Sequence, residues 1–424
     1  GGRELEVAVH MVFGELIVAV LWTVVIACVA IFWDDPRLSP LLWIVAASVV
    51  PAKLAAIYQV FALCDKAFWL QARIELIRCC FVTALVLAGV QKGGLVAVLG
   101  APVLGSLLVI FLYRRHYSLG LRGVKLRYAE FLRQARIGLP ITGLNVVSGN
   151  AGLQRWLERV LIQSSFGTAS LGVYAFAAWV ASQLLAMLGA VAQAIQPHLY
   201  DLLAQELTSD EARRRLVRPT WLMSVAAAVF LGAVASVLPN AIEAIVPEYK
   251  SCLPALQVLI AATFLSAVFW IPALILYSVR LNGQGSYFVF WTAAVAISIA
   301  IAAVALAYGG GVIWVAWGYL VSQGVVLVLT FRRVAQLLFP EKGDAIDFVK
   351  SLFLPIVNAL LAVLATQAIS MPLDVMPDEV WALLIMAAVK GALFCLLCLP
   401  TLYVIERRIG LMALFSRNRP AAAA

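Results

Sequence analysis

The sequence predicts an all-α polytopic membrane protein, and three observations support this fold class. Hydrophobic residues make up 64% of the 424-residue chain and charged residues only 12%, against roughly 45–50% and about 25% in soluble domains. Apolar runs of about 20 residues recur along the whole length, which is the length that a helix needs to cross a hydrocarbon core ~30 Å thick. A transmembrane β-barrel would instead show alternating segments of ~10 residues.

These runs predict twelve transmembrane helices, four before and eight after the longest polar break, residues 114–136. Each predicted helix is a predominantly apolar stretch, and short polar breaks separate it from its neighbours. The first four helices are 11–33, 41–63, 70–90 and 94–113. The other eight are 137–162, 169–197, 220–238, 252–278, 287–307, 311–331, 350–370 and 380–403.

The basic residues fix the orientation of these helices. Residues 114–136 are the longest basic stretch, so the positive-inside rule places them in the cytoplasm. Alternation then places the basic runs Arg213–Arg215, Arg332–Arg333 and Arg407–Arg408 on the same side, while Asp374 and Asp378 fall outside. Both chain ends are therefore predicted to be cytoplasmic.

The same pattern argues against several function classes. The net charge of +9 is mostly the orientation signal, so we do not interpret it as a nucleic-acid-binding surface. The seven cysteines lie mostly within or at the ends of apolar runs and the three histidines are scattered, so neither disulfides nor a metal site are predicted. All predicted outer loops are short, which argues against an enzyme with a sugar site on the outer face.

Charged residues within the predicted spans are the candidates for function, because each costs ~2.5–3.5 kcal/mol at a helix centre. In the helix 137–162, one face is polar, small and basic within an arc of about 120°, at about 100° per residue. This face holds Asn145, Ser148, Gly149, Gly152, Arg155 and Arg159. Close helix packing explains the two glycines equally well, but it does not explain arginine. We therefore predict the wall of a water-filled, cationic cavity.

Arginine in such a cavity indicates an anionic cargo, since its planar guanidinium group stays charged and donates paired hydrogen bonds to phosphate. Glu158 flanks this face and is spaced to pair with Arg155 at i,i+3. Lys53 lies near the middle of its span, and Arg78 follows Glu75 by three residues, which predicts a second pair. The predicted binding residues are Arg155, Arg159, Lys53, Arg78, Asn145 and Ser148, with Glu158 and Glu75 as charge partners.

Residues 131–180, FLRQARIGLPITGLNVVSGNAGLQRWLERVLIQSSFGTASLGVYAFAAWV, resemble a known family. They are similar to the start of the second lobe of bacterial oligosaccharide-lipid flippases, within the multidrug/oligosaccharidyl-lipid/polysaccharide exporter superfamily. The segments IVPEYKSCLPALQVLI, LNGQGSYFVF and YGGGVIWVAWGYLVSQG resemble the connections between later helices of that family. The motifs that carry the resemblance are Gly138-Leu139-Pro140, Glu158-Arg159 and Gly172-Val173-Tyr174.

The resemblance implies a fourteen-helix fold of two six-helix lobes and a final pair. The twelve predicted helices match its third to fourteenth, so the first two are expected to be missing from this chain, which starts without methionine. The expected divisions are 1–113 for a remnant of the N-terminal lobe, 114–136 for a basic cytoplasmic linker, 137–333 for the C-terminal lobe, and 334–424 for two further helices and a cytoplasmic tail.

The resemblance further implies a flippase rather than an enzyme. Undecaprenyl-diphosphate-linked oligosaccharide would pass from the cytoplasmic to the outer face of the bacterial inner (plasma) membrane, for O-antigen, capsule or exopolysaccharide assembly. Its polyprenyl tail would stay in lipid, in a groove near the last two helices and Lys390. The implied partners are membrane lipids, this cargo and the polysaccharide polymerase or assembly machinery. No cofactor is implied, and coupling to protons, sodium or membrane potential stays open.

Two alternatives stay open as well. One is another exporter of the same superfamily, for a lipid-linked peptidoglycan precursor or a drug. Drug exporters that move cations normally need acidic cavity residues, whereas the predicted cavity here is basic. The other is a membrane glycosyltransferase, polymerase or ligase, which also handles polyprenyl diphosphates with arginines, but the short outer loops argue against it.

Overall fold

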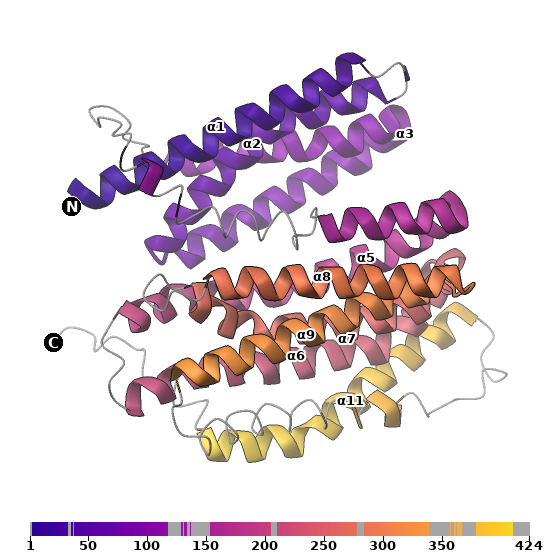
Figure 1. Cartoon of the computed structure of the whole chain (residues 1–424). Coiled ribbons are helices and arrows are strands. Elements are labelled where there is room, and N and C mark those ends of the chain that lie inside the picture. Colours follow the sequence, from indigo (N-terminus) through magenta and orange to yellow (C-terminus); the bar gives the residue numbers. More distant parts are fainter. Residues whose placement is uncertain are drawn as a thin grey trace. The chain divides into compact units, whose positions relative to one another are not determined.

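The computed structural model describes residues 2–32, 35–36, 38–117, 129, 131–133, 136, 153–204, 210–277, 284–338, 357, 360–361, 363–366 and 379–409. All regular structure within these ranges is helical (Figure 1). Nine stretches among them are long and apolar enough to cross a membrane. The predicted fold class, an all-α polytopic membrane protein, is confirmed. The count of twelve stays a prediction, because much of helices 137–162 and 350–370 lies outside the described residues.

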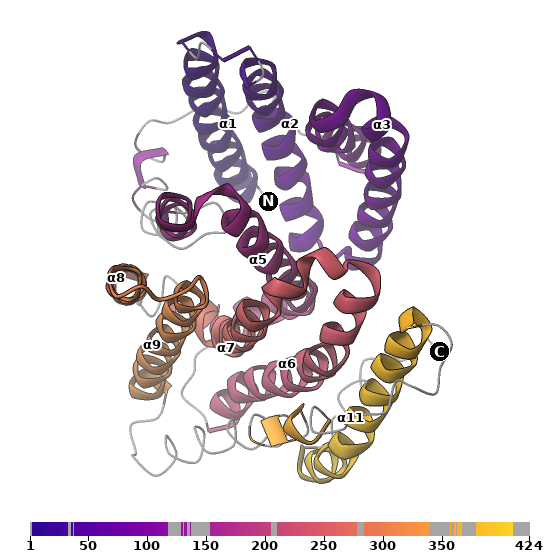
Figure 2. The same cartoon turned by 90° about the vertical axis from the view of Figure 1, so that its right-hand side faces the viewer.

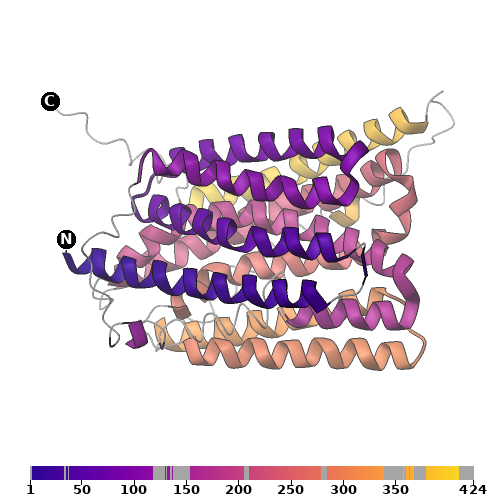
Figure 3. The same cartoon turned by 90° about the horizontal axis from the view of Figure 1, so that it is seen from above.

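The chain divides into two compact units, Gly1–Leu139 and Pro140–Ala424. Unit 1 contains α1 (Gly2–Phe32), α2 (Ser39–Cys64) and α3 (Phe68–Arg114). Its helices run roughly along one direction (Figure 3), and α2 packs against both α1 and α3. The small core of unit 1 includes Tyr58 and Tyr113, whose rings stack with their centroids 6.1 Å apart.

Two antiparallel arms make up α3. Gly94 has φ 52° and ψ −130°, a backbone conformation that favours glycine, and the chain reverses at this residue. Gly105 of the second arm consequently packs against Val82 of the first arm, so closely that a Cβ atom on Gly105 would collide with the valine. These two arms correspond to the predicted helices 70–90 and 94–113.

Unit 2 is built around α7, the helix with the most buried span. Figure 2 shows α7 between α5, α6 and α9, and it packs against all three. On the periphery, α8 packs against α9, and α11 packs against α6. The elements are α5 (Leu153–Ala204), α6 (Asp210–Ile245), the 3-10 helix η1 (Pro247–Cys252), α7 (Leu253–Tyr277), α8 (Gln284–Ala307), α9 (Ile313–Leu338) and α11 (Glu379–Ile409).

The apolar runs predict the spans but not the ends of the helices. The sequence predicts a span at 220–238, whereas α6 runs from Asp210 to Ile245. Residues 239–251, which connect the predicted spans 220–238 and 252–278, are consequently mostly helical, within α6 and η1. Hydropathy reports which residues lie in hydrocarbon, but a helix continues into water for as long as its backbone hydrogen bonds continue.

The chain also reverses within α5, at Gly167. This residue has φ 79° and ψ −178°, a region of backbone space that is essentially restricted to glycine. We call residues 153–166 the first arm of α5 and residues 168–204 the second arm. The turn brings the start of the second arm back along the first, which decides the contacts of the candidate site.

We expect Gly167→Ala to lower the free energy of unfolding by roughly 1–3 kcal/mol, because a Cβ atom strains this backbone conformation even in open space. Gly172→Ala is the matched control, since Gly172 lies in the same helix and nothing lies within 4 Å of a Cβ atom at either glycine. It should be neutral or stabilising, because alanine favours a helix over glycine by about 1 kcal/mol. Denaturant titration of both variants in micelles measures the difference, and equal stabilities would contradict the role of Gly167.

Candidate functional site

Glu158 on the first arm of α5 is the centre of a buried polar cluster, with its side chain 0% exposed. Its Oε2 atom accepts hydrogen bonds from Nη1 of Arg155 at 3.1 Å and from the hydroxyl of Tyr174 at 3.0 Å. The pair that the i,i+3 spacing predicts therefore forms. Tyr174 reaches the carboxylate because the turn at Gly167 folds the second arm back onto the first.

Aromatic and amide contacts tie this pair to α8 and α9. The guanidinium carbon of Arg155 lies 3.9 Å from the centroid of the Tyr319 ring, which is a cation–π contact. The amide Nε2 of Gln154 donates to the hydroxyls of Ser298 on α8, at 3.2 Å, and Ser322 on α9, at 3.3 Å. The Glu158 cluster, as we name it, consists of Gln154, Arg155, Glu158, Tyr174, Ser298, Tyr319 and Ser322.

A close approach of α8 and α9 positions the two serines. Gly318 of α9 faces the backbone carbonyl oxygen of Ser298, and a Cβ atom on Gly318 would lie only 2.7 Å from that oxygen. The glycine therefore lets the two helices approach each other near Ser322, one turn further along α9. Gln154 can reach both hydroxyls because the helices meet at this point.

Arg159 lies one turn beyond Arg155 but has different surroundings. Its side chain is exposed, and it has no ion pair with a carboxylate among the described residues. The Arg155 side chain, by contrast, is 12% exposed. Asn145 and Ser148, the other predicted members of this polar face, lie outside the described residues.

Both predicted basic residues of unit 1 are paired. Nζ of Lys53 on α2 lies 2.7 Å from Oε2 of Glu15 on α1, with the side chains 45% and 50% exposed. Glu75 pairs with Arg78, as their spacing predicts, and it also accepts a hydrogen bond from Nε2 of Gln59 at 3.4 Å. These contacts join α1 to α2 and α2 to α3.

Lys390, which the resemblance places near a lipid groove, lies on α11 where that helix packs against α6. Its Nζ atom donates to Oδ1 of Asn240 on α6 at 3.4 Å. Near it, Gly232 of α6 leaves room for the buried ring of Phe394 on α11. The structure therefore gives Lys390 a polar partner between two closely packed helices, and the groove stays a prediction.

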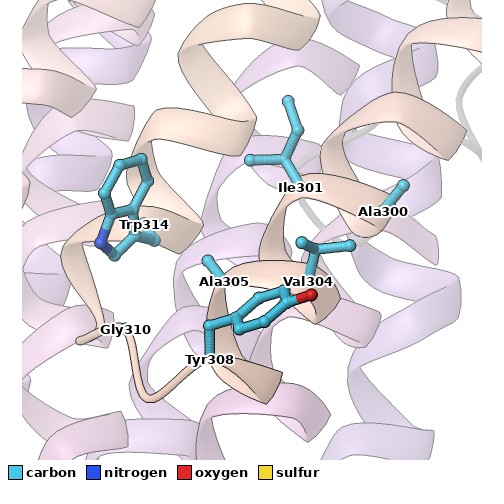
Figure 4. A pocket seen from close by; sticks show the side chains of 7 residues that line it. All are labelled: Ala300, Ile301, Val304, Ala305, Tyr308, Gly310 and Trp314. Atoms are coloured by element: carbon cyan, nitrogen blue, oxygen red, sulfur yellow. The ribbon is translucent and has the colours of Figure 1, made fainter.

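A surface pocket lies at the connection between α8 and α9 (Figure 4), and its lining carries no charged side chain. It therefore does not suit a phosphate group. Exposed tyrosine and tryptophan near the ends of spans are typical of a membrane–water interface. The residues that line the pocket are Ala300, Ile301, Val304, Ala305, Tyr308, Gly310 and Trp314. Within the described ranges, no three His, Cys, Asp or Glu side chains lie together as a metal site would require.

Sequence reasoning finds Arg155 and Glu158 but misses the side chains that hold them. A turn predicted at Gly167 would have indicated the contact between Glu158 and Tyr174, because the two residues are about equally far from Gly167. Tyr319 and Gln154 give no such signal, since the residues that each contact joins are more than 140 positions apart in the chain.

The fold and the site define a multi-pass helical membrane protein with both paired and exposed cations in its spans. The chain belongs to the family described as "Polysaccharide biosynthesis protein", which matches residues 7–245, more than half of its length. The predicted membership of the polysaccharide-export group is thereby confirmed. The matched region includes the first arm of α5 and Tyr174.

Among solved structures, the chain is similar to one titled "Lipid II flippase MurJ, inward closed conformation". The TM-score is 0.50 and the identity 13%, over 96% of this chain and 85% of that chain. At this identity the likeness concerns the fold alone. A comparison with curated proteins finds no significant match.

Proposed function

We propose that the protein is a flippase that moves undecaprenyl-diphosphate-linked oligosaccharide from the cytoplasmic to the outer face of the bacterial inner membrane. The translocated oligosaccharide would serve O-antigen, capsule or exopolysaccharide assembly, in contact with membrane lipids and with a polysaccharide polymerase. In this proposal the protein is a transporter and not an enzyme, and it needs no cofactor.

One observation carries the proposal: a member of a polysaccharide biosynthesis family keeps an exposed arginine, Arg159, within a membrane-spanning segment. A cation within a span is costly, up to ~2.5–3.5 kcal/mol at the centre, so a functional reason is expected for it. A diphosphate is an anion that arginine binds through charge-assisted hydrogen bonds. The fold likeness to a protein titled a flippase agrees with transport of a lipid-linked molecule.

Proteoliposomes test this proposal. We expect the protein to accelerate the transbilayer movement of fluorescent undecaprenyl-diphosphate oligosaccharide at least ~10-fold over protein-free vesicles, because the cationic residues lower the barrier for the anionic head group. The same oligosaccharide on an uncharged lipid of equal length is the control and should move at the background rate. Equal rates for the two lipids would contradict an anion-selective flippase. A change in glycan length, read by mass spectrometry, would favour the polymerase alternative.

A further inference from the structure

Burial changes steadily around the first arm of α5. Counting about 100° per residue from Gln154, Glu158 lies at about 40°, Arg155 at about 100° and Arg159 at about 140°. Gln154 and Glu158 are buried, the Arg155 side chain is 12% exposed, and Arg159 is exposed. Trp156, at about 200°, is also exposed. Arg159 thus lies on the border between the buried polar cluster and the exposed apolar side of the arm.

The guanidinium group of Arg155 already has partners. Glu158 accepts a hydrogen bond from its Nη1 atom, and the Tyr319 ring lies against the group. Paired hydrogen bonds from Arg155 to a phosphate would compete with these contacts, and the carboxylate of Glu158 would repel the phosphate. Arg155 and Glu158 together carry no net charge. On this arm, therefore, Arg159 supplies the positive charge that a phosphate group can neutralise.

The Glu158 cluster also fixes the rotation of the first arm. Three side chains that lie within about one turn of one another on the first arm contact partners on the second arm, on α8 and on α9. They are Gln154, Arg155 and Glu158. Rotation of the arm about its axis would break these contacts together. The direction in which Arg159 points is therefore coupled to the cluster, although Arg159 itself is exposed.

We propose that Arg159 contacts the phosphate groups of the lipid-linked cargo, whereas Arg155, Glu158 and Tyr174 are positioning residues that fix the direction of Arg159. This inference rests on the proposed function and assigns different tasks to the two arginines. The group that Arg159 would contact is a phosphate ester of a lipid, and such a group is present both in the cargo and in a phospholipid headgroup. The cargo's diphosphate carries more negative charge than a phosphodiester, so Arg159 should favour the cargo.

Binding to undecaprenyl diphosphate in phosphatidylcholine nanodiscs tests the assignment of Arg159. Arg159→Gln should weaken binding at least ~10-fold, because charge-assisted hydrogen bonds are lost, and should leave the Tm unchanged. The matched variant Arg155→Gln should lower the Tm, because it leaves the buried Glu158 carboxylate without its cation. Wild-type affinity in Arg159→Gln, or a further loss of affinity when Arg155→Gln is added to Arg159→Gln, would overturn the division of roles.

A second binding measurement distinguishes the two sources of phosphate, the cargo and the phospholipid headgroups. The nanodiscs are prepared with phosphatidylglycerol in place of part of the phosphatidylcholine. We expect the affinity for undecaprenyl diphosphate to fall less than ~3-fold, because salt screens most of the repulsion between the dilute anionic lipid and the diphosphate. Full competition by phosphatidylglycerol, lost in Arg159→Gln, would mean that Arg159 binds headgroups and would overturn its assignment to the cargo.

Transport kinetics test the positioning role of Tyr174. Tyr174→Phe removes only the hydroxyl that donates a hydrogen bond to Glu158. We therefore expect the half-saturating cargo concentration to rise ~3–10-fold with an unchanged maximal rate of transport. This rise should be absent in the Arg159→Gln background. Tyr308→Phe, at an exposed tyrosine outside the Glu158 cluster, is the control. A lower Tm and maximal rate with an unchanged half-saturating concentration would overturn the positioning role.

Failure of this inference differs from failure of the proposed function. A wild-type protein that binds and transports the cargo, with Arg159→Gln behaving identically, would overturn only the assignment of Arg159. A folded wild-type protein that neither binds undecaprenyl diphosphate nor moves its oligosaccharide would overturn both.

Discussion

Replacing Glu158 with alanine is expected to lower the free energy of unfolding by about 3 kcal/mol. The substitution leaves the guanidinium group of Arg155 without its carboxylate, in a place where that side chain is only 12% exposed. It also removes the acceptor for the hydroxyl of Tyr174, which is almost fully buried. An unpaired charge in such surroundings is costly because little water reaches it.

Reversible unfolding in detergent micelles, followed by far-UV circular dichroism, measures this loss. Glu248→Ala is the matched control, since Glu248 is exposed in η1 and should change stability by less than about 0.5 kcal/mol. If the two alanine variants are equally stable, the Glu158 cluster does not hold unit 2 together.

Gly318→Ala should destabilise unit 2 by roughly 2 kcal/mol, because a new methyl group would overpack the contact between α8 and α9. Its Cβ atom would lie 2.7 Å from the backbone carbonyl oxygen of Ser298, which cannot turn aside as a side chain can. This collision is relieved only if α8 and α9 move apart. That movement would draw the Ser298 hydroxyl away from the Gln154 amide, which donates to it at 3.2 Å.

Gly324→Ala on the same helix is the control for this prediction. The nearest atom to a Cβ at Gly324 is Cδ1 of Leu265 at 3.9 Å, which is ordinary contact. Its stability should equal or exceed that of the wild type, since alanine favours a helix over glycine by about 1 kcal/mol. Equal unfolding midpoints for the two variants would show that α8 and α9 tolerate a wider separation at the cluster.

Local regularities in the sequence predict much of the fold. Apolar runs of membrane-spanning length predict the spans, since the hydrocarbon core demands length and low polarity from each segment separately. The pairs Arg155–Glu158 and Arg78–Glu75 follow from i,i+3 spacing within a single helix, and both form. Helix ends are less predictable, as α6 demonstrates by continuing to Ile245, past its apolar run.

The candidate site is predicted only in part, because helical periodicity treats residues of one face alike. Arg155 and Arg159 fall within one arc of the predicted helix, yet Arg155 lies against Glu158 and Tyr319 whereas Arg159 is exposed. A rotation of about 40° between them separates the two environments. The partner of Lys53, Glu15 on α1, also lies outside any local pattern, since 38 residues separate the two.

The sequence by itself determined that this chain is a multi-pass helical membrane protein, that basic residues lie within its spans, and that it resembles the polysaccharide-export family. Each of these properties depends on composition or on residues close together in the chain. Only the tertiary structure decided that Lys53 pairs with Glu15, that the Arg155–Glu158 pair is buried and that Arg159 is exposed. The reason is that a charge within a span is stabilised by whichever helix packs beside it, and the reversal at Gly167 and the contact at Gly318 bring those partners together.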